Sequence, residues 1–534
     1  MARDAISIER ILETEGPLLS SRLCAILEER GLSAAAARQR ISRANDDFGD
    51  VKRLHGLVFP RGVRFLYHDS TFNSERYWGA LLRDIGEASP AYAAAIAALQ
   101  ARGGIVPRGH WDIVSGSPLR QKGQISSETV LERLSRVQLL EQVDIGGIGP
   151  CVRIAANGYL GSAPMLQLKA RLITEKILLL AVKEWARQLG VASYDKVLLR
   201  DDAGGPPKVG TLLWDVTGPS YLRPMIRRDA DGKPKPGFLV CDVIIGDHEI
   251  SERAVRAFVR KCQLLASFKR MGPLLPVLIS DRYSREGFNL GRSQGIMMAT
   301  PGTLFGREVA AGLAALLQIL TKAAAIAVQR PEAIGELFDK LGAIEGAAAN
   351  LRGALFEMLV GHCVMKMEDG SIDIGKTVVD LDTAKSAEID VFRVKEYREV
   401  WSYECKAHEP GEIIARDAVE HWITDRVPVI HRALRREQRF QQCAFHYEYW
   451  ACGSFAPDAL ALLNEAADRT KKYAIGWKDG DAVRAYVAKI KPKAVANMFD
   501  QHFFQHPIAI FNRRNNATAA LPKIADVDLE LAES

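Results

Sequence analysis

The sequence lacks the features that would tie it to a membrane, to an oxidising compartment or to a zinc site. No run of about eighteen uncharged apolar residues occurs, since Gln318 and Lys322 interrupt the Ala-rich segment 309–328. The N-terminus has no apolar signal-peptide core. The eight cysteines include no CxxC pair, so neither a disulfide framework nor a zinc finger is indicated. We therefore expect a cytoplasmic protein that does not enter a membrane.

Strong charge of one sign is also missing. The formal net charge is +6 and the sequence pI is about 8.8, which suits a polyanionic partner without identifying one. Hydrophobic residues make up 48% of the chain, enough for sizeable cores. A length of 534 residues exceeds one compact domain, so we expect three or four domains.

Residues 1–84 predict three helices followed by a hairpin. Ser33 is placed to cap the third helix, over residues 34–43, and the hairpin covers 51–59 and 63–67. This order resembles a winged helix-turn-helix. The third helix carries polar side chains that suit contacts with DNA phosphates and base edges: Arg38, Gln39, Arg40 and Arg43. The alternative is a winged-helix module that binds protein and whose basic face is merely solvated.

Residues 85–160 repeat this plan more faintly. A helix is expected at 92–102 and another begins at Ser126, with a serine cap and an early acid. Strands at 139–144 and 151–154 then form a second hairpin. This second winged-helix-like domain has fewer exposed cations, which favours packing against its neighbour over binding DNA.

Asp390, Glu404 and Lys406 lie in two short apolar runs, 388–394 and 400–407. Successive side chains of a strand point to opposite faces, so Glu404 and Lys406 share a face. Asp390 stands between two apolar residues, where an ionised group is costly unless it is compensated. Two acidic oxygen donors on neighbouring strands suit a hard divalent cation, and a lysine beside them can hold a phosphate or activate a water. The pattern favours metal-assisted phosphodiester hydrolysis. The alternative is the solvated face of an edge strand.

These residues resemble the active site of the PD-(D/E)XK, or restriction-endonuclease-like, nuclease superfamily. In that family an acid on one strand of a hairpin is followed by an acid-x-lysine triplet on the next strand. Asp390 matches the first acid, and Glu404 and Lys406 match the triplet, with thirteen residues between the two acids. Ile389 stands where the family often has proline.

The resemblance implies a role for each site residue. Glu357 sits where many members carry a further glutamate on the preceding helix; alternatively it is an exposed helix residue. A Mg²⁺ (or Mn²⁺) ion would be held by Asp390, Glu404 and the backbone carbonyl of Cys405, with Glu357 completing the metal shell. Lys406 would orient the attacking water and offset charge on the scissile phosphate.

Residues 161–335 predict a degenerate copy of the same α/β fold. Three acids recur in the same order along the chain, on a long helix and on two strands: Glu175, Asp215 and Asp242. Ile244 stands where the lysine belongs, so that role is vacant unless Lys261 or Arg256 reaches in from the following helix. The alternative is an unrelated α/β domain whose aspartates lie at strand ends.

We therefore expect a multidomain α/β protein whose catalytic domain is 336–534, a nuclease domain with a C-terminal extension. The resemblance covers about residues 345–480, and a helix is expected at 415–437 after the hairpin. It implies a metal-dependent DNA endonuclease acting on duplex DNA, with a role in restriction or phage defence by analogy alone. A homodimer is compatible with this reading. Two alternatives stay open: a non-catalytic DNA-binding regulator built on a nuclease fold, and a scaffold whose winged helices bind protein.

Overall fold

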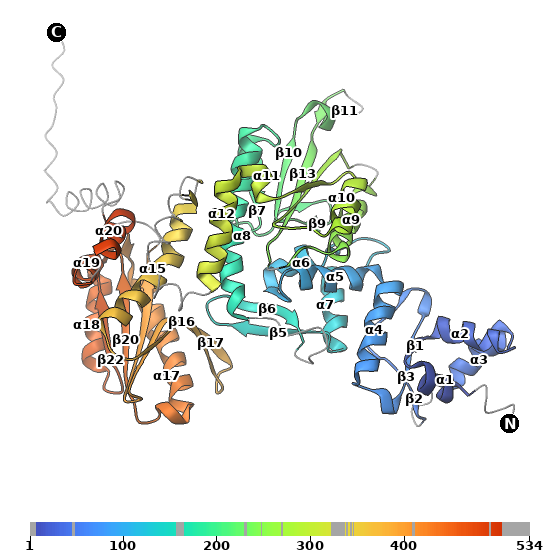
Figure 1. Ribbon diagram of the computed structural model, residues 1–534, viewed down its shortest axis with the longest axis horizontal. Coiled ribbons are helices and arrows are strands. Elements are labelled where there is room, and N and C mark those ends of the chain that lie inside the picture. Colours follow the sequence, from blue (N-terminus) through green and yellow to red (C-terminus); the bar gives the residue numbers. More distant parts are fainter. Residues whose placement is uncertain are drawn as a thin grey trace, which may run out of the picture. The chain divides into compact units, whose positions relative to one another are not determined.

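The computed structural model divides the chain into two compact units, described separately here (Figure 1). Unit 1 comprises residues 1–144 and 148–311, and unit 2 comprises 145–147 and 312–534. The expected division into four domains stays a prediction. None of the described helices is long and apolar enough to cross a membrane. The structure describes residues 7–44, 49–155, 165–228, 232–246, 248–268, 271–321, 337, 340–341, 344, 347–407, 412–490 and 493–504.

Unit 1 begins with three helices and a three-stranded antiparallel sheet of order β1-β3-β2. Ser33 accepts a hydrogen bond from the backbone N–H of Ala36 and so caps the third helix. The elements are α1 (Ile8–Glu15), β1 (Leu18–Leu19), α2 (Ser20–Glu29), α3 (Ala34–Arg43), β2 (Val51–Arg53) and β3 (Phe65–His68).

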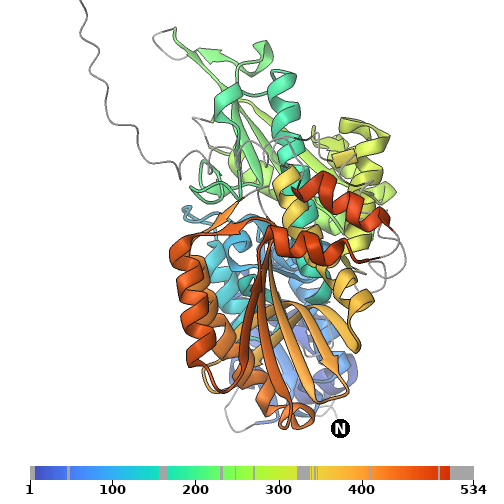
Figure 2. The ribbon, with the colours of Figure 1, turned by 90° about the vertical axis from the view of Figure 1, so that its left-hand side faces the viewer.

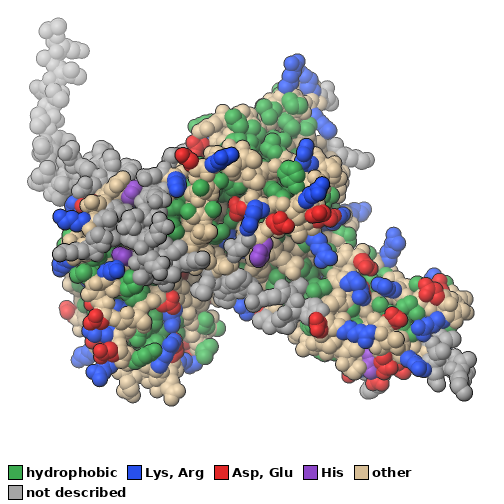
Figure 3. All heavy atoms as spheres, viewed as in Figure 1, with side chains coloured by type: hydrophobic (Ala, Val, Ile, Leu, Met, Phe, Trp, Pro, Cys, Tyr) green, Lys and Arg blue, Asp and Glu red, His purple; other side chains and the backbone are tan. Residues whose placement is uncertain are grey.

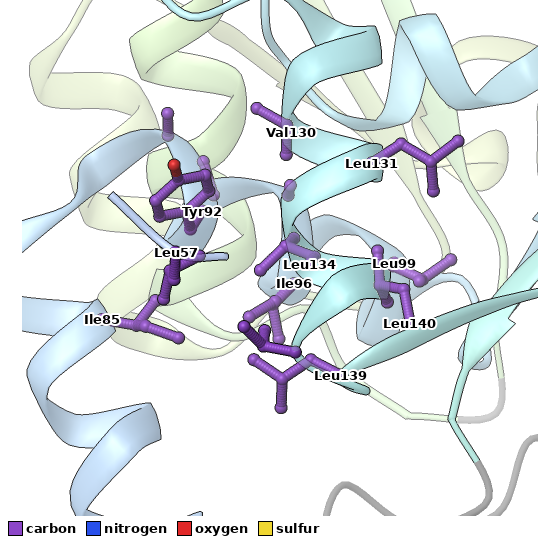
Figure 4. Close-up of a cluster of buried hydrophobic side chains, with 14 of the residues drawn as sticks. Leu57, Ile85, Tyr92, Ile96, Leu99, Val130, Leu131, Leu134, Leu139 and Leu140 are labelled. Atoms are coloured by element: carbon purple, nitrogen blue, oxygen red, sulfur yellow. The ribbon is translucent and has the colours of Figure 1, made fainter. Parts of the chain in front are cut away.

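The next segment repeats this sheet, now in the order β4-β6-β5. Its elements are α4 (Glu75–Ala88), α5 (Pro90–Ala101), β4 (Ile105–Pro107), α6 (Trp111–Val114), α7 (Ser127–Arg136), β5 (Leu140–Ile145) and β6 (Gly149–Ile154). One cluster of buried side chains joins both segments: Leu57 of the first packs with Ile85, Tyr92 and Ile96 of α4 and α5 (Figure 4). The two small segments of unit 1 thus share a core.

The remainder of unit 1 is a five-stranded mixed sheet of order β15-β14-β13-β10-β7. The long helix α8 packs against β7, β10 and β13, whereas α9 contacts β14 and α10 contacts β15. The elements are α8 (Met165–Gln188), β7 (Leu198–Leu199), β8 (Lys208–Val209), β9 (Leu212–Leu213), β10 (Val216–Ser220), β11 (Arg227–Arg228), β12 (Pro234–Lys235), β13 (Gly237–Ile244), α9 (Glu252–Ala266), β14 (Leu274–Ser280), α10 (Arg285–Ser293), β15 (Met297–Ala299), α11 (Pro301–Phe305) and α12 (Arg307–Thr321).

Unit 2 holds a second five-stranded mixed sheet, of order β16-β17-β18-β20-β22. Helix α15 packs on β16, β17 and β18, and Figure 2 shows the sheet between α15 and α18. The elements are α15 (Ala347–Met367), β16 (Ser371–Asp380), β17 (Lys385–Lys395), β18 (Glu399–Lys406), β19 (Ile413–Ile414), α16 (Arg416–His421), α17 (Val427–Arg436), β20 (Ala444–Ala451), β21 (Ser454–Phe455), α18 (Pro457–Arg469), β22 (Ala474–Lys478), α19 (Gly480–Val487) and α20 (Lys493–Phe499).

The two large sheets have the same topology. In each, a long helix leads to an edge strand, two antiparallel strands follow, and two helical crossovers add two parallel strands. The central strands β13 and β17 are buried along most of their length because helices cover both faces of each sheet. The order of elements expected for a repeated α/β fold is therefore present in both units.

Two expectations about secondary structure were wrong in detail. Asp215 was expected on a strand, but it lies between β9 and β10, because β9 pairs with β8 and β10 pairs with β13. The helix expected over 415–437 is interrupted by a π-helical turn at Trp422–Arg426. Single π turns inside α-helices often mark functional positions.

Basic and acidic side chains are interspersed over the face of the molecule drawn in Figure 3. Both signs occur over most of that face, in keeping with the small net charge of +6, whereas the tip that carries β11 shows Lys and Arg alone among its described charged side chains.

Candidate active site

In unit 2, strands β17 and β18 separate where the predicted acids stand. The pairing of β17 with β18 starts beside the hairpin turn and ends with Val391 opposite Tyr403. Moving away from the turn, the next residue is Asp390 on β17 and Glu404 on β18. Beyond the last pair, the backbone N–H of Cys405 donates to Oδ2 of the Asp390 side chain, at 2.7 Å. This hydrogen bond holds the Asp390 carboxylate beside that of Glu404.

Glu404 receives two cations. Lys406 Nζ lies 2.8 Å from Glu404 Oε1, and the guanidinium of Arg426 donates to the same oxygen. Arg426 comes from the π-helical turn; it also donates to the Glu388 carbonyl at 2.6 Å and lies 4.0 Å from Asp390 Oδ1. Its positive charge therefore stands between the two acids.

The two acids are almost fully buried, whereas the cations reach solvent. Asp390 and Glu404 are each 4% exposed, but the side chains of Lys406 and Arg426 are 33% and 21% exposed. Burial, and then the neighbouring charge of Asp390, raises the pKa of Glu404 above its usual range. Burial alone would lower the pKa of Lys406, but the charges of Glu404 and Asp390 outweigh it and raise that pKa. Lys406 therefore stays charged at neutral pH.

Glu357 lies on α15, which packs against β17 and β18. It is half-buried, not exposed, and its charge contributes to raising the pKa values of Cys405 and Arg426. The buried Glu388 acts on Arg426 in the same way. The structure thus brings Glu357 close to the two strand acids, as expected, and adds Glu388.

The acids of unit 1 occupy the same geometry. The pairing of β10 with β13 ends with Val216 opposite Cys241, and the next residues beyond this pair are Asp215 and Asp242. The N–H of Val243, the residue after Asp242, donates to Asp215 Oδ2 at 2.8 Å. The position of Asp215 therefore corresponds to that of Asp390, and Asp242 to Glu404.

Buried cations surround the acids of unit 1. Arg200 donates to Asp215 Oδ1 at 3.0 Å and to Glu175 Oε2 at 2.6 Å. Lys261 donates to both carboxylate oxygens of Asp242, at 2.9 and 2.6 Å. Two further arginines complete the cluster: Arg102 Nη2 lies 3.7 Å from Asp215 Oδ2, and Arg171 Nε lies 3.5 Å from Glu175 Oε1.

The two centres therefore differ in charge balance. In unit 1, four buried cations surround Glu175, Asp215 and Asp242. The charges of Arg200 and Arg102 overcome burial to lower the pKa of Asp215, whereas burial raises the pKa of Asp242. In unit 2, two partly exposed cations face four acids, and the pKa of Glu404 is raised. The carboxylates of unit 2 outnumber the cations beside them, whereas in unit 1 protein cations neutralise the carboxylates.

Carboxylates alone do not complete a metal shell in either centre. No group of three or more His, Cys, Asp or Glu side chains suited to hold a metal ion is found within the described ranges. A metal ion in unit 2 would therefore need a backbone carbonyl, such as that of Cys405, besides Asp390 and Glu404.

The basic helix α3 presents its polar side chains to solvent. On this helix Ala37 faces the core and is buried, whereas Arg38, Gln39 and Arg43 are exposed and Arg40 is half-exposed. The four predicted contact residues therefore lie on an accessible part of unit 1.

Several cations of these centres were not expected from the sequence. Arg426 lies in an amphipathic helical segment that carries several other arginines, so the sequence does not indicate that this one contacts the acids. Arg102 and Arg200 follow a helix and a short strand and resemble ordinary surface residues. Lys261 was one of two named candidates and does reach Asp242; the other, Arg256, is exposed and pairs with Glu252. Lys261 differs from Arg256 in being buried on the inner face of α9.

Comparison with known proteins adds little. No family model matches the sequence, and no curated protein matches it. Among solved structures, the restriction endonuclease FokI is matched with a TM-score of 0.20 and 10% identity, over 91% of this chain and 83% of that one. A TM-score this low establishes no common fold.

Proposed function

We propose that this chain is a metal-dependent DNA endonuclease of the PD-(D/E)XK type and that unit 2 carries the active site. The observation that supports this most is the convergence of buried Asp390 and Glu404 with Lys406 at the point where two central strands separate. Buried acids in such excess over cations are costly unless a further positive charge compensates them. A dication would supply that charge.

Asp390, Glu404 and the carbonyl of Cys405 would hold Mg²⁺ or Mn²⁺, with Glu357 beside them. When bound, the metal would lower the pKa of a water and stabilise negative charge on the phosphate. Lys406, charged and partly exposed, would orient that water and contact the scissile phosphate. Arg426 would neutralise Glu404 when no metal is bound.

Metal dependence tests the proposal directly. Purified protein should nick or cut plasmid DNA with Mg²⁺ or Mn²⁺ and should leave it intact in EDTA, because the two acids cannot activate water alone. Gel electrophoresis of supercoiled plasmid is the measurement. Cleavage that persists unchanged in EDTA would rule out the mechanism. Failure to cut any DNA substrate would instead favour a DNA-binding regulator on a nuclease-like fold.

We further propose that the first segment of unit 1 is a winged helix that positions duplex DNA through α3. Its element order and sheet order, β1-β3-β2, support the resemblance. The exposed Arg38, Gln39, Arg40 and Arg43 support the assignment of α3 as the contact helix.

Replacing Arg38, Arg40 and Arg43 with alanine should weaken duplex binding and reduce its dependence on salt. Each lost phosphate contact removes about 0.9 from the slope of log K against log salt, so the slope should fall by up to about 2.7. Fluorescence anisotropy at several salt concentrations measures this. Unaltered affinity and slope would assign the winged helix to protein binding.

A further inference from the structure

A groove of about 860 Å³ lies in unit 1. It runs between α4 and α5 on one side and α9 and α10 on the other; α5 and α9 are neighbours in Figure 1. Small residues of α5, Ala93, Ala94 and Ala97, contribute to its lining. Such side chains leave room for a ligand backbone to approach the helix closely.

The charged side chains of the groove are mainly arginines. Arg83, Arg253, Arg256 and Arg260 line it, against one acid, Glu87. Arg83 is paired with Asp84 and Arg256 with Glu252, while Arg253 has no ion-pair partner among the described residues. The groove therefore carries an excess of positive charge.

Three of these arginines are arranged in a row and do not converge on one point. Arg253, Arg256 and Arg260 are spaced by about one turn each on α9 and span about 10 Å along its axis. A single phosphate or carboxylate would engage only one or two of them. A chain of successive negative charges would engage the exposed Arg253 and Arg256 and pass beside Arg260, which donates to the Gly116 carbonyl at 2.9 Å.

The remaining lining indicates how such a chain would be recognised. None of the side chains that line the groove is aromatic, so there is no platform on which bases would stack. Contacts to phosphates position a nucleic acid without reporting its sequence. Recognition here would depend on the backbone and would be independent of sequence.

We propose that this groove binds a short phosphodiester chain, a few nucleotides of a single DNA strand, through the arginines of α9. The inference concerns binding and holds whether or not unit 2 cleaves DNA. If unit 2 does cleave, the groove is a second contact with the substrate, distinct from α3.

The test uses the full-length protein in EDTA, so that cleavage plays no part. The ligand is fluorescein-labelled hexathymidylate, and anisotropy is measured between 25 and 200 mM salt. The groove variant is R253Q/R256Q, which alters two exposed side chains. The charge-matched control is K208Q/R223Q, whose residues are exposed and do not line the groove. Circular dichroism checks that both variants are folded.

The groove variant should lose binding to hexathymidylate, with a slope of log K against log salt smaller by about 1.4, or 0.7 for each lost phosphate contact. The control should bind as the unaltered protein does. A parallel measurement with a 30-base-pair duplex carrying a single-stranded tail shows whether the bound phosphodiester chain belongs to a larger DNA or to a free oligonucleotide. Weaker binding there too assigns the groove to DNA, and an effect on hexathymidylate alone assigns it to free oligonucleotides. Equal affinity and slope for the groove variant and the control would overturn the proposal.

Discussion

Replacing Lys406 with alanine is expected to abolish DNA cleavage while leaving DNA binding nearly intact. In the structure, Lys406 is the more exposed of the two cations beside Glu404, and its raised pKa keeps it protonated at neutral pH. Loss of one group that stabilises charge in a transition state lowers a rate by about 10²–10³-fold. Cleavage rate per folded molecule and duplex affinity in EDTA are the two measurements.

Two further variants control for charge and for fold. K385A removes an exposed lysine at the start of the same strand pair and should cleave normally. K406R keeps the charge but alters its geometry, so partial activity is expected. D390A and E404A should also be inactive, because they remove the two proposed metal ligands. An active, metal-dependent K406A protein would contradict the assignment of Lys406.

The second large effect is expected on stability and concerns unit 1. In D215A, Arg200 and Arg102 would remain buried without one of their acidic partners. Breaking a buried ion pair by removing one partner costs about 3–5 kcal/mol, because an uncompensated charge stays in the interior. The urea unfolding of D215A, followed by circular dichroism, should therefore shift to clearly lower concentration. Its cleavage rate per folded molecule should be retained.

Controls separate this effect from a general loss of fold. D195A removes an exposed aspartate of the same unit and should change stability by less than about 0.5 kcal/mol. D242N keeps the side-chain volume while removing the negative charge that faces Lys261. If D215A or D242N were folded and bound to DNA yet as inactive as K406A, the degenerate assignment would be wrong. The two units would then have to act as one catalytic machine.

Local patterns were enough to predict much of this organisation. The apolar runs around Asp390 and Glu404 predicted neighbouring strands, and Ser33 with the following alanines predicted α3, because both depend on periodicity and capping within a few residues. The edge strand β16 was not predicted. Most of its side chains are exposed or half-exposed, and it lacks the continuous apolar run of the inner strands. The end of strand pairing beside the acids also gave no signal, since it depends on how two strands diverge.

The sequence by itself determined that Asp390 and Glu404 stand on neighbouring strands and that Glu404 and Lys406 share a face, since one residue along a strand decides which face a side chain takes. Only the tertiary structure decided what surrounds them. Arg426 reaches Glu404 from 22 residues further along the chain, and Arg102 lies 141 residues before Val243, whose carbonyl accepts its hydrogen bond. The charge balance of each centre depends on these distant cations, because electrostatic energy follows distance in space and burial, neither of which local sequence encodes.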